Sequence, residues 1–137
     1  MFEDSSPGAA DDGAVMTVVV VDDDEALLRA LRFSLELDGF RVIACEDADA
    51  VPVEALPEAN GCLVLDYRLP EMDGLELLAR LRAQSVTLPA ILITSHFSPA
   101  LRRRAEAAGA ALVEKPLLGD ILPTAIRAAL AAAQTTP

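Results

Sequence analysis

Five polar side chains stand at the ends of apolar runs of the sequence, where their types could do chemistry. Asp22 and Asp23 follow MTVVVV, Asp66 follows GCLVL, Thr94 ends PAILIT, and Lys115 follows ALVE. A solvated aspartate rarely ends an apolar run, whereas three aspartates stand at the ends of such runs in this sequence. We therefore expect these groups to be functional rather than ordinary surface residues.

The chemistry that such a group could perform is phosphoryl transfer assisted by a divalent cation. Two carboxylates ~4 Å apart repel by roughly 4 kcal/mol at an effective dielectric of about 20, and a hard cation removes that cost. Oxygen ligands alone favour Mg²⁺, which keeps several of its waters. One carboxylate could then attack a phosphorus atom, while Lys115 neutralises the transferring oxygens and Thr94 donates a hydrogen bond to one of them.

The order of the predicted elements places these groups on one edge of a sheet. Apolar runs at 16–21, 41–45, 61–66, 89–94 and 111–114 predict strands that alternate with helical segments. This alternation predicts an α/β fold, a doubly wound (βα)5 flavodoxin-like sandwich with a parallel five-stranded sheet in the order 2-1-3-4-5. In that order the carboxyl ends of strands one, three, four and five are neighbours. Pro52 and Pro57 limit any helix between residues 47 and 56 to a short or irregular one.

Local signals predict where the helices begin and end. Asp24, Asp73 and Ser98 stand where helix N-caps are needed, and proline follows Ser98. Gly39 is well placed to end the first helix. The buried face of the helix after Asp73 is expected to consist of Leu75, Leu78 and Leu81.

Length and composition predict one domain. We expect a flexible acidic N-terminal arm at 1–14, the folded domain at 15–133 and a tail at 134–137. The net charge of -11 argues against direct binding to nucleic acid, and the basic cluster Arg102 to Arg104 is better interpreted as a solvated helix face. Neither a signal peptide nor the roughly 20 apolar residues of a membrane span is visible, so we expect a cytoplasmic protein without membrane contact.

The cysteines and the histidine indicate no metal cluster of their own. Cys45 and Cys62 lie in apolar runs without CxxC spacing, so buried reduced thiols are expected. His96 comes two residues after Thr94 and could border the site. The backbone N–H of Tyr67 is expected to face the phosphate, and its ring to pack nearby.

Four segments resemble the receiver domains of response regulators in bacterial two-component systems. They are VVVVDDDEALLRAL, LVLDYRLPEMDGLEL, LPAILITSH and VEKP, and the resemblance covers the chain from about residue 16 to residue 130. Together they supply an acidic pair, a central aspartate with an LPxMDG loop, a threonine and a Lys-Pro in that order. LPAILITSH, Arg68 and VEKP most resemble receivers of the nitrogen-fixation-regulator type, which precede helix-turn-helix outputs. No output domain follows Pro137 in this sequence, so a stand-alone receiver and a piece of a longer regulator are both open.

The resemblance implies a phosphoryl acceptor with a Mg²⁺ site. Asp66 resembles the phosphorylated aspartate, which is also a metal ligand. Asp23 resembles the direct Mg²⁺ ligand, and Asp22 its neighbour that acts through water. The main-chain carbonyl of Arg68 would be the remaining protein ligand.

The resemblance also implies how the phosphoryl group is held and where it comes from. Thr94 resembles the switch hydroxyl and Lys115 the phosphate-binding lysine, joined to Pro116 by a cis bond. The phosphodonor would be a sensor histidine kinase or a phosphotransfer protein. Such a domain is not an enzyme acting on other substrates, but it takes part in its own phosphorylation and dephosphorylation.

One position departs from the family pattern. Many receivers carry Tyr or Phe three residues before the lysine, and this sequence has Leu112, which offers no hydroxyl and less area. We still expect Thr94 to move toward the phosphoryl group and Leu112 to fill the vacated space. The face formed by the helix at 98–109 and the strand at 111–114, including Leu101, is expected to be a Leu-rich, weakly charged surface for a partner or for a homodimer that forms on phosphorylation.

Two rival functions stay open. A haloacid-dehalogenase-type phosphatase also uses an aspartate nucleophile after a strand, and Asp22-x-Asp24 mimics its first motif. That motif normally continues with threonine, and here Glu25 and Ala26 follow, without a later acidic pair or a cap insertion. The other rival is a receiver that only binds partners and has lost phosphorylation. The complete set of site residues argues against it, and Leu112 keeps it open.

Overall fold

The computed structural model describes residues 15–135 of the chain and the side chains of residues 15–133, and it contains one parallel five-stranded sheet. The strand order is β2-β1-β3-β4-β5, which confirms the predicted order and fold class. The strands differ from their predicted bounds by at most one residue. They are β1 (Thr17–Val21), β2 (Arg41–Cys45), β3 (Gly61–Asp66), β4 (Ala90–Thr94) and β5 (Ala110–Glu114).

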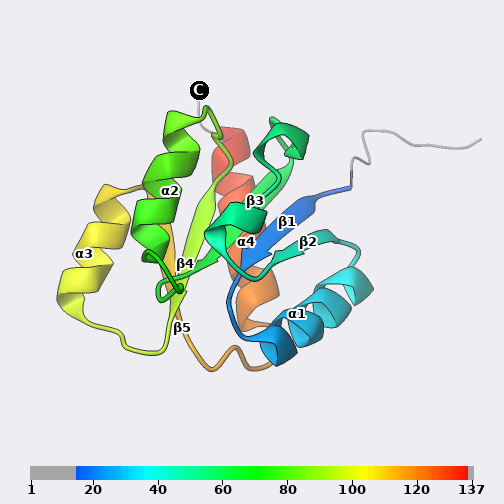
Figure 1. The fold of residues 1–137 in the computed structure, drawn as a ribbon. Coiled ribbons are helices and arrows are strands. Elements are labelled where there is room, and N and C mark those ends of the chain that lie inside the picture. The colour runs from blue at the N-terminus through cyan, green and yellow to red at the C-terminus, as the bar shows by residue number, and fades with distance from the viewer. Residues whose placement is uncertain (1–14, 136–137) are drawn as a thin grey trace, which may run out of the picture.

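Helices cover both faces of this sheet (Figure 1). α1 (Glu25–Leu37) and α4 (Ile121–Thr135) pack on one face, while α2 (Gly74–Ala83) and α3 (Pro99–Ala107) pack on the other. The connection from β2 to β3 holds two 3-10 turns, Ala48–Ala50 and Val53–Ala55, in place of an α-helix. The prolines at 52 and 57 explain this shortened crossover, as predicted.

The predicted helix caps are confirmed. The carboxylate of Asp24 accepts a hydrogen bond from the N–H of Leu27, and Ser98 caps α3 with proline in the first helical position. Asp73 forms a reciprocal capping box with Glu76 at the start of α2. Gly39 adopts a φ of +93° directly after α1, the left-handed conformation in which glycine ends a helix.

Alternate residues of the central strands divide the core into two apolar layers. Val19 and Val21 face α2 and α3, while Val18 and Val20 face α1 and α4. The predicted buried face of α2 is partly wrong, because Leu75 is only half-buried. The buried leucines of α2 are Leu77, Leu78 and Leu81.

Both cysteines lie in this core as free thiols, as predicted. Burial, and to a lesser degree the charge of Asp47, raises the pKa of Cys45 to about 11. Burial raises the pKa of Cys62 to about 12. Because the thiolate is the reactive form, both cysteines are inert packing residues at neutral pH.

The expected domain bounds stay a prediction. The arm at 1–14 and the last two residues of the expected tail lie outside the described residues. Among residues 15–135, no helix is long and apolar enough to cross a membrane.

Candidate functional site

The carboxyl ends of four strands gather the predicted site residues. In the sheet register, Val21 pairs with Leu65 and Asp66 pairs with Ile93. Asp22, Asp66 and Thr94 therefore follow one another across the edge of the sheet, each at or just after the end of its strand. The N–H of Lys115 donates to the carbonyl of Thr94 over 2.7 Å, which brings the fifth strand's end to the same edge.

Lys115, the only lysine of the chain, bridges two buried carboxylates. Its Nζ lies 3.0 Å from Oδ2 of Asp22 and 3.3 Å from Oδ2 of Asp66. Asp22 is fully buried, and Asp66 is 6% exposed. Two charges removed from water on β1 and β3 thus share a single cation from the end of β5.

Two backbone amides complete the pairing of these carboxylates. The N–H of Asp24 donates to Oδ1 of Asp22 over 2.9 Å, and the N–H of Arg68 donates to Oδ1 of Asp66 over 3.3 Å. In both cases an aspartate accepts from the residue two positions later, as in an Asx turn. That spacing was visible in the sequence and could have identified the Arg68 amide.

The expectation for Tyr67 is wrong. Its backbone N–H donates to the carbonyl of Ile93 over 2.8 Å and so extends the parallel pairing of β3 with β4. The amide beside the carboxylate of Asp66 is that of Arg68. The error arose because the ladder between the strands continues one residue beyond Asp66.

Thr94 lies at the predicted place and is 1% exposed. Its Oγ accepts a hydrogen bond from the backbone N–H of His96 over 3.1 Å. His96 therefore contributes its amide to this edge of the sheet, and no contact of its imidazole with the site residues is seen in the described part of the chain. The switching role of Thr94 stays a prediction.

Two buried carboxylates share one ammonium in this site, and the pKa of Asp66 is raised. Burial and then the charge of Asp22 raise the pKa of Asp66, against the opposing effects of Lys115 and the Arg68 amide. Burial alone would lower the pKa of Lys115, but its hydrogen bond to Asp22 and the charges of Asp22 and Asp66 outweigh it. The pKa of Lys115 is therefore raised. A second cation would relieve the excess negative charge.

The carboxylates fit a divalent metal ion. One carboxylate oxygen from each of Asp22, Asp23 and Asp66 lies within 4.8 Å of the other two. Asp22 and Asp66 are buried and Asp23 is exposed, so the cluster opens to water on one side. An oxygen-only donor set that leaves room for water is the kind that Mg²⁺ prefers. The main-chain carbonyl of Arg68 stays a predicted ligand.

Gly74 allows α2 to begin directly against the acceptor strand. Its N–H donates to the carbonyl of Tyr67, and a Cβ there would lie 2.5 Å from the backbone oxygen of Asp66 and 2.6 Å from Cδ1 of Leu92. Contacts of this kind cannot be relieved by a side-chain rotation alone, because one of the two atoms belongs to the backbone.

Gly74→Ala should therefore destabilise the fold by about 2 kcal/mol, since overpacking at a fixed backbone contact forces the strand or the helix to move. The free energy of unfolding in urea measures this. Gly39→Ala is the control, because its Cβ would meet nothing within 4 Å. The free energy of unfolding of that variant should fall by only about 1 kcal/mol, because alanine is strained at the positive φ of this position. Equal losses at the two glycines would contradict the close approach.

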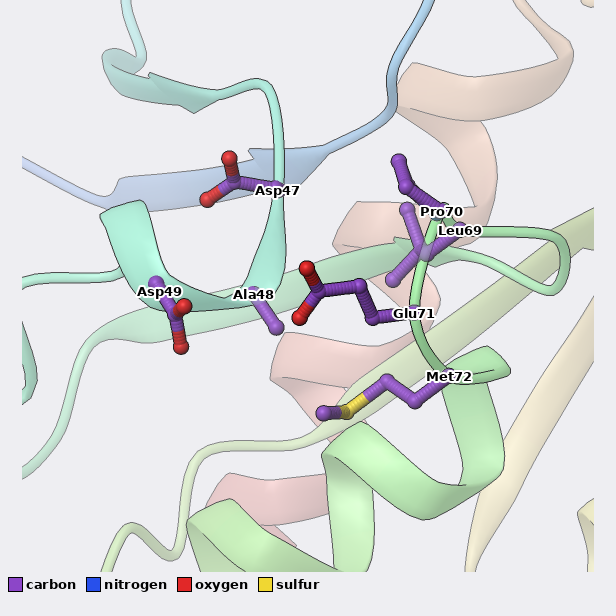
Figure 2. Close-up of a pocket in the computed structure, with 7 residues that line it drawn as sticks. All are labelled: Asp47, Ala48, Asp49, Leu69, Pro70, Glu71 and Met72. Atoms are coloured by element: carbon purple, nitrogen blue, oxygen red, sulfur yellow. The ribbon is translucent and has the colours of Figure 1, made fainter.

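A small pocket beside the loop after Asp66 is separate from this site. Figure 2 shows its lining residues, with the carboxylates of Asp47, Asp49 and Glu71 around it. Asp49 also pairs with Arg80 of α2 at 3.8 Å. None of the predicted site residues lines this pocket.

The predicted character of the α3–β5 face is also wrong in part. Leu101 is 5% exposed and belongs to the core, and Leu112 is half-buried against the same apolar layer. The exposed residues of α3 include its three arginines, Arg102, Arg103 and Arg104. The face is therefore charged rather than Leu-rich, because α3 turns its leucine inward, while the arginines lie on the solvated face that was predicted for them.

Comparison with protein families gives one match that spans most of the chain. The family described as the response regulator receiver domain matches residues 18–127. Among curated proteins, the chain is 39% identical over 111 residues to the transcriptional regulatory protein FixJ of Bradyrhizobium diazoefficiens, covering 80% of this chain and 54% of that protein. It is 40% identical over 105 residues to the C4-dicarboxylate transport transcriptional regulatory protein DctD of Pseudomonas aeruginosa, covering 76% of this chain and 23% of that protein.

Solved structures agree with this match. The crystal structure of FixJ-N has a TM-score of 0.75 and 36% sequence identity, covering 86% of this chain and 95% of that one. The response regulator StyR has a TM-score of 0.77 and 39% identity, covering 87% and 61%. The Vibrio cholerae chemotaxis protein CheY4, at 24% identity and a TM-score of 0.77, supports the fold alone. The chain thus spans between about a quarter and half of the length of the curated relatives named above.

Proposed function

This chain belongs to the response regulator receiver domain family, and on that premise we propose that it accepts a phosphoryl group on Asp66. The observation that carries the proposal is the bridge from Lys115 to both Asp22 and Asp66 at the carboxyl edge of the sheet. It supports a site in which one carboxylate reacts while another, with a cation, balances the charge. The phosphodonor is a sensor histidine kinase or a phosphotransfer protein.

In the proposed reaction, a carboxylate oxygen of Asp66 attacks the phosphorus atom of a phosphohistidine. The new O–P bond forms as the N–P bond breaks, and the histidine leaves as an imidazole that takes up a proton. The ammonium of Lys115 lies 3.3 Å from Asp66 and is placed to neutralise the transferred oxygens. The hydroxyl of Thr94, which now accepts from the His96 amide, is free to donate to one of those oxygens.

Mg²⁺ is the metal proposed for this site. Asp22, Asp23, Asp66 and the main-chain carbonyl of Arg68 would hold it, Asp22 through water. When bound, it supplies positive charge that stabilises the phosphoryl oxygens during transfer. Hydrolysis of the acyl phosphate by water at the same site would return Asp66 to its carboxylate form, so the chain takes part in its own dephosphorylation without acting on other substrates.

The output of the reaction is proposed to pass through the face formed by α3 and β5. Phosphorylation would shift the populations of two packings by differential contacts at Thr94 and at Leu112, which packs against the core from β5. The partner is a further protein or a second copy of this chain. Because the exposed residues of α3 include three arginines, electrostatic contacts are better suited to that surface than the hydrophobic contact expected from the sequence.

Incubation of the chain with acetyl phosphate tests this function. With Mg²⁺ we expect one phosphoryl group per chain, labile to hydroxylamine and located on Asp66 by mass spectrometry. With EDTA in place of Mg²⁺ the label should be absent. A label on Asp22, or steady release of phosphate from p-nitrophenyl phosphate, would favour the rival phosphatase. A chain that takes no label with Mg²⁺ would favour the receiver that only binds partners.

A further inference from the structure

Arg104 on α3 reaches across to the residue that follows the acceptor. Its Nη1 donates to the hydroxyl of Tyr67 over 3.1 Å, and its guanidinium carbon lies 5.9 Å from the centre of the Tyr67 ring. These residues are 37 positions apart in the sequence, and Tyr67 packs half-buried against the core layer beneath α2 and α3. A hydrogen bond and a cation–π contact thus join the same two side chains.

The same arginine also reaches the other end of the loop that follows Asp66. Its Nη2 lies 3.9 Å from Oδ2 of Asp73. Asp73 is the N-cap of α2, and its other oxygen accepts from the N–H of Glu76 over 2.8 Å. Arg104 therefore contacts both ends of the segment from Tyr67 to Asp73.

That segment carries groups on which the acceptor depends. The N–H of Arg68, within it, donates to Oδ1 of Asp66. The backbone of Tyr67 is fixed on both sides, because its N–H donates to Ile93 and its carbonyl accepts from Gly74. Its side chain is the part of the residue that extends toward α3. The position of the Tyr67 side chain therefore depends on its contact with Arg104 of α3.

We propose that Arg104 is a positioning residue for phosphoryl acceptance, because it joins both ends of the loop Tyr67–Asp73 to α3 and so limits the movement of that loop beside Asp66. This inference rests on the function proposed for Asp66 and extends it to a residue outside the site.

The side chain of Arg104 is 55% exposed, so a role in stability alone has to be distinguished from a role in positioning the loop. Exposed ion pairs contribute little to stability, so a change in melting temperature would not distinguish these two roles of Arg104. The rate of phosphoryl acceptance and the environment of Tyr67 would decide. Tyr67 is the only tyrosine, and the chain has no tryptophan, so the tyrosine fluorescence reports on this residue alone.

A double-mutant cycle on the full chain tests the proposal. Arg104→Gln and Tyr67→Phe should each slow labelling by acetyl phosphate and Mg²⁺ about threefold, and the double variant should be no slower than either single one. Arg103→Gln is the matched control, since it removes the same charge from the exposed face of the same helix. In the unphosphorylated chain, Arg104→Gln should make Tyr67 more accessible to quenching by acrylamide, and Arg103→Gln should not.

The possible outcomes distinguish the positioning role of Arg104 from the acceptor function of Asp66. Non-additive slowing together with increased quenching of Tyr67 supports the positioning role. Additive rates, or an Arg104→Gln chain that labels as fast as the Arg103→Gln chain, overturn it while the function of Asp66 stands. A wild-type chain that takes no label at all overturns the proposed function itself, and the positioning role with it.

Discussion

Asp66→Asn is expected to abolish labelling by acetyl phosphate, because the amide has no carboxylate oxygen to attack phosphorus. The variant keeps the size of the side chain, so the fold should persist. Intact-mass spectrometry after incubation with Mg²⁺ measures the loss. Asp49→Asn removes an equally charged but exposed carboxylate outside the site and should label as the wild type does. Residual labelling of Asp66→Asn at another residue would contradict the assignment of the acceptor.

The same variant should stabilise the metal-free chain at neutral pH. The folded-state pKa of Asp66 is raised by burial and by the charge of Asp22, so its ionised form destabilises the native state. The stability associated with its protonated form is present at low pH and is lost as the pH rises through the raised pKa. In EDTA, Asp66→Asn should therefore melt higher than the wild type at about pH 7, and the gain should vanish at about pH 3. A gain that persists at the lower pH would contradict this cause.

Lys115→Met is expected to have the second large effect, on both labelling and stability. Asp22 is fully buried and Asp66 nearly so, and this substitution leaves both without their shared cation. Removing one partner of a buried ion pair costs about 3 kcal/mol. We expect that loss in the metal-free chain near neutral pH, measured by urea unfolding. Labelling should fall at least about tenfold, since the transferred oxygens lose an ammonium.

The pH dependence of this loss follows from the two carboxylates. Lys115 itself has a raised pKa, so in the wild type its contribution is present at neutral pH and is lost only as the pH rises through that value. In Lys115→Met the deficit should shrink as the pH falls and Asp66 takes up a proton. Arg29→Met is the control, because its pair with Glu25 at 3.6 Å is exposed and worth less than about 1 kcal/mol. A similar loss in both variants would contradict the buried bridge.

The sequence predicted the elements that local chemistry controls. The β-branched run before Asp22 and the apolar run before Asp66 are strands because their residues are apolar on both faces, as a covered parallel sheet requires. Asp24, Asp73 and Ser98 cap the helices because a short side-chain oxygen satisfies an amide three residues later. The two prolines of the second crossover prevented an α-helix there. The strand order then followed from the rules for parallel sheets.

Other features depended on how the elements pack. Which leucines of α2 are buried was set by the rotation of the helix against the sheet, which exchanged Leu75 for Leu77. The inward position of Leu101 has the same kind of cause, and it left the arginines rather than the leucine on the outer face of α3. The spacing of apolar residues gives the width of the apolar stripe of a helix. It leaves the rotation of the helix about its axis, relative to the sheet, uncertain by about one residue.

The candidate site shows the same division. The sequence alone indicated its residue types, because polar groups at the ends of apolar strands must meet at one edge of a doubly wound sheet. Only the tertiary structure decided which atoms pair: Lys115 with both Asp22 and Asp66, the Arg68 amide rather than that of Tyr67 with Asp66, and Arg104 with Tyr67. The physical reason is that such pairings depend on distances of about 3 Å between segments far apart in the chain. Those distances are fixed by the packing of helices and loops on the sheet, which no local pattern encodes.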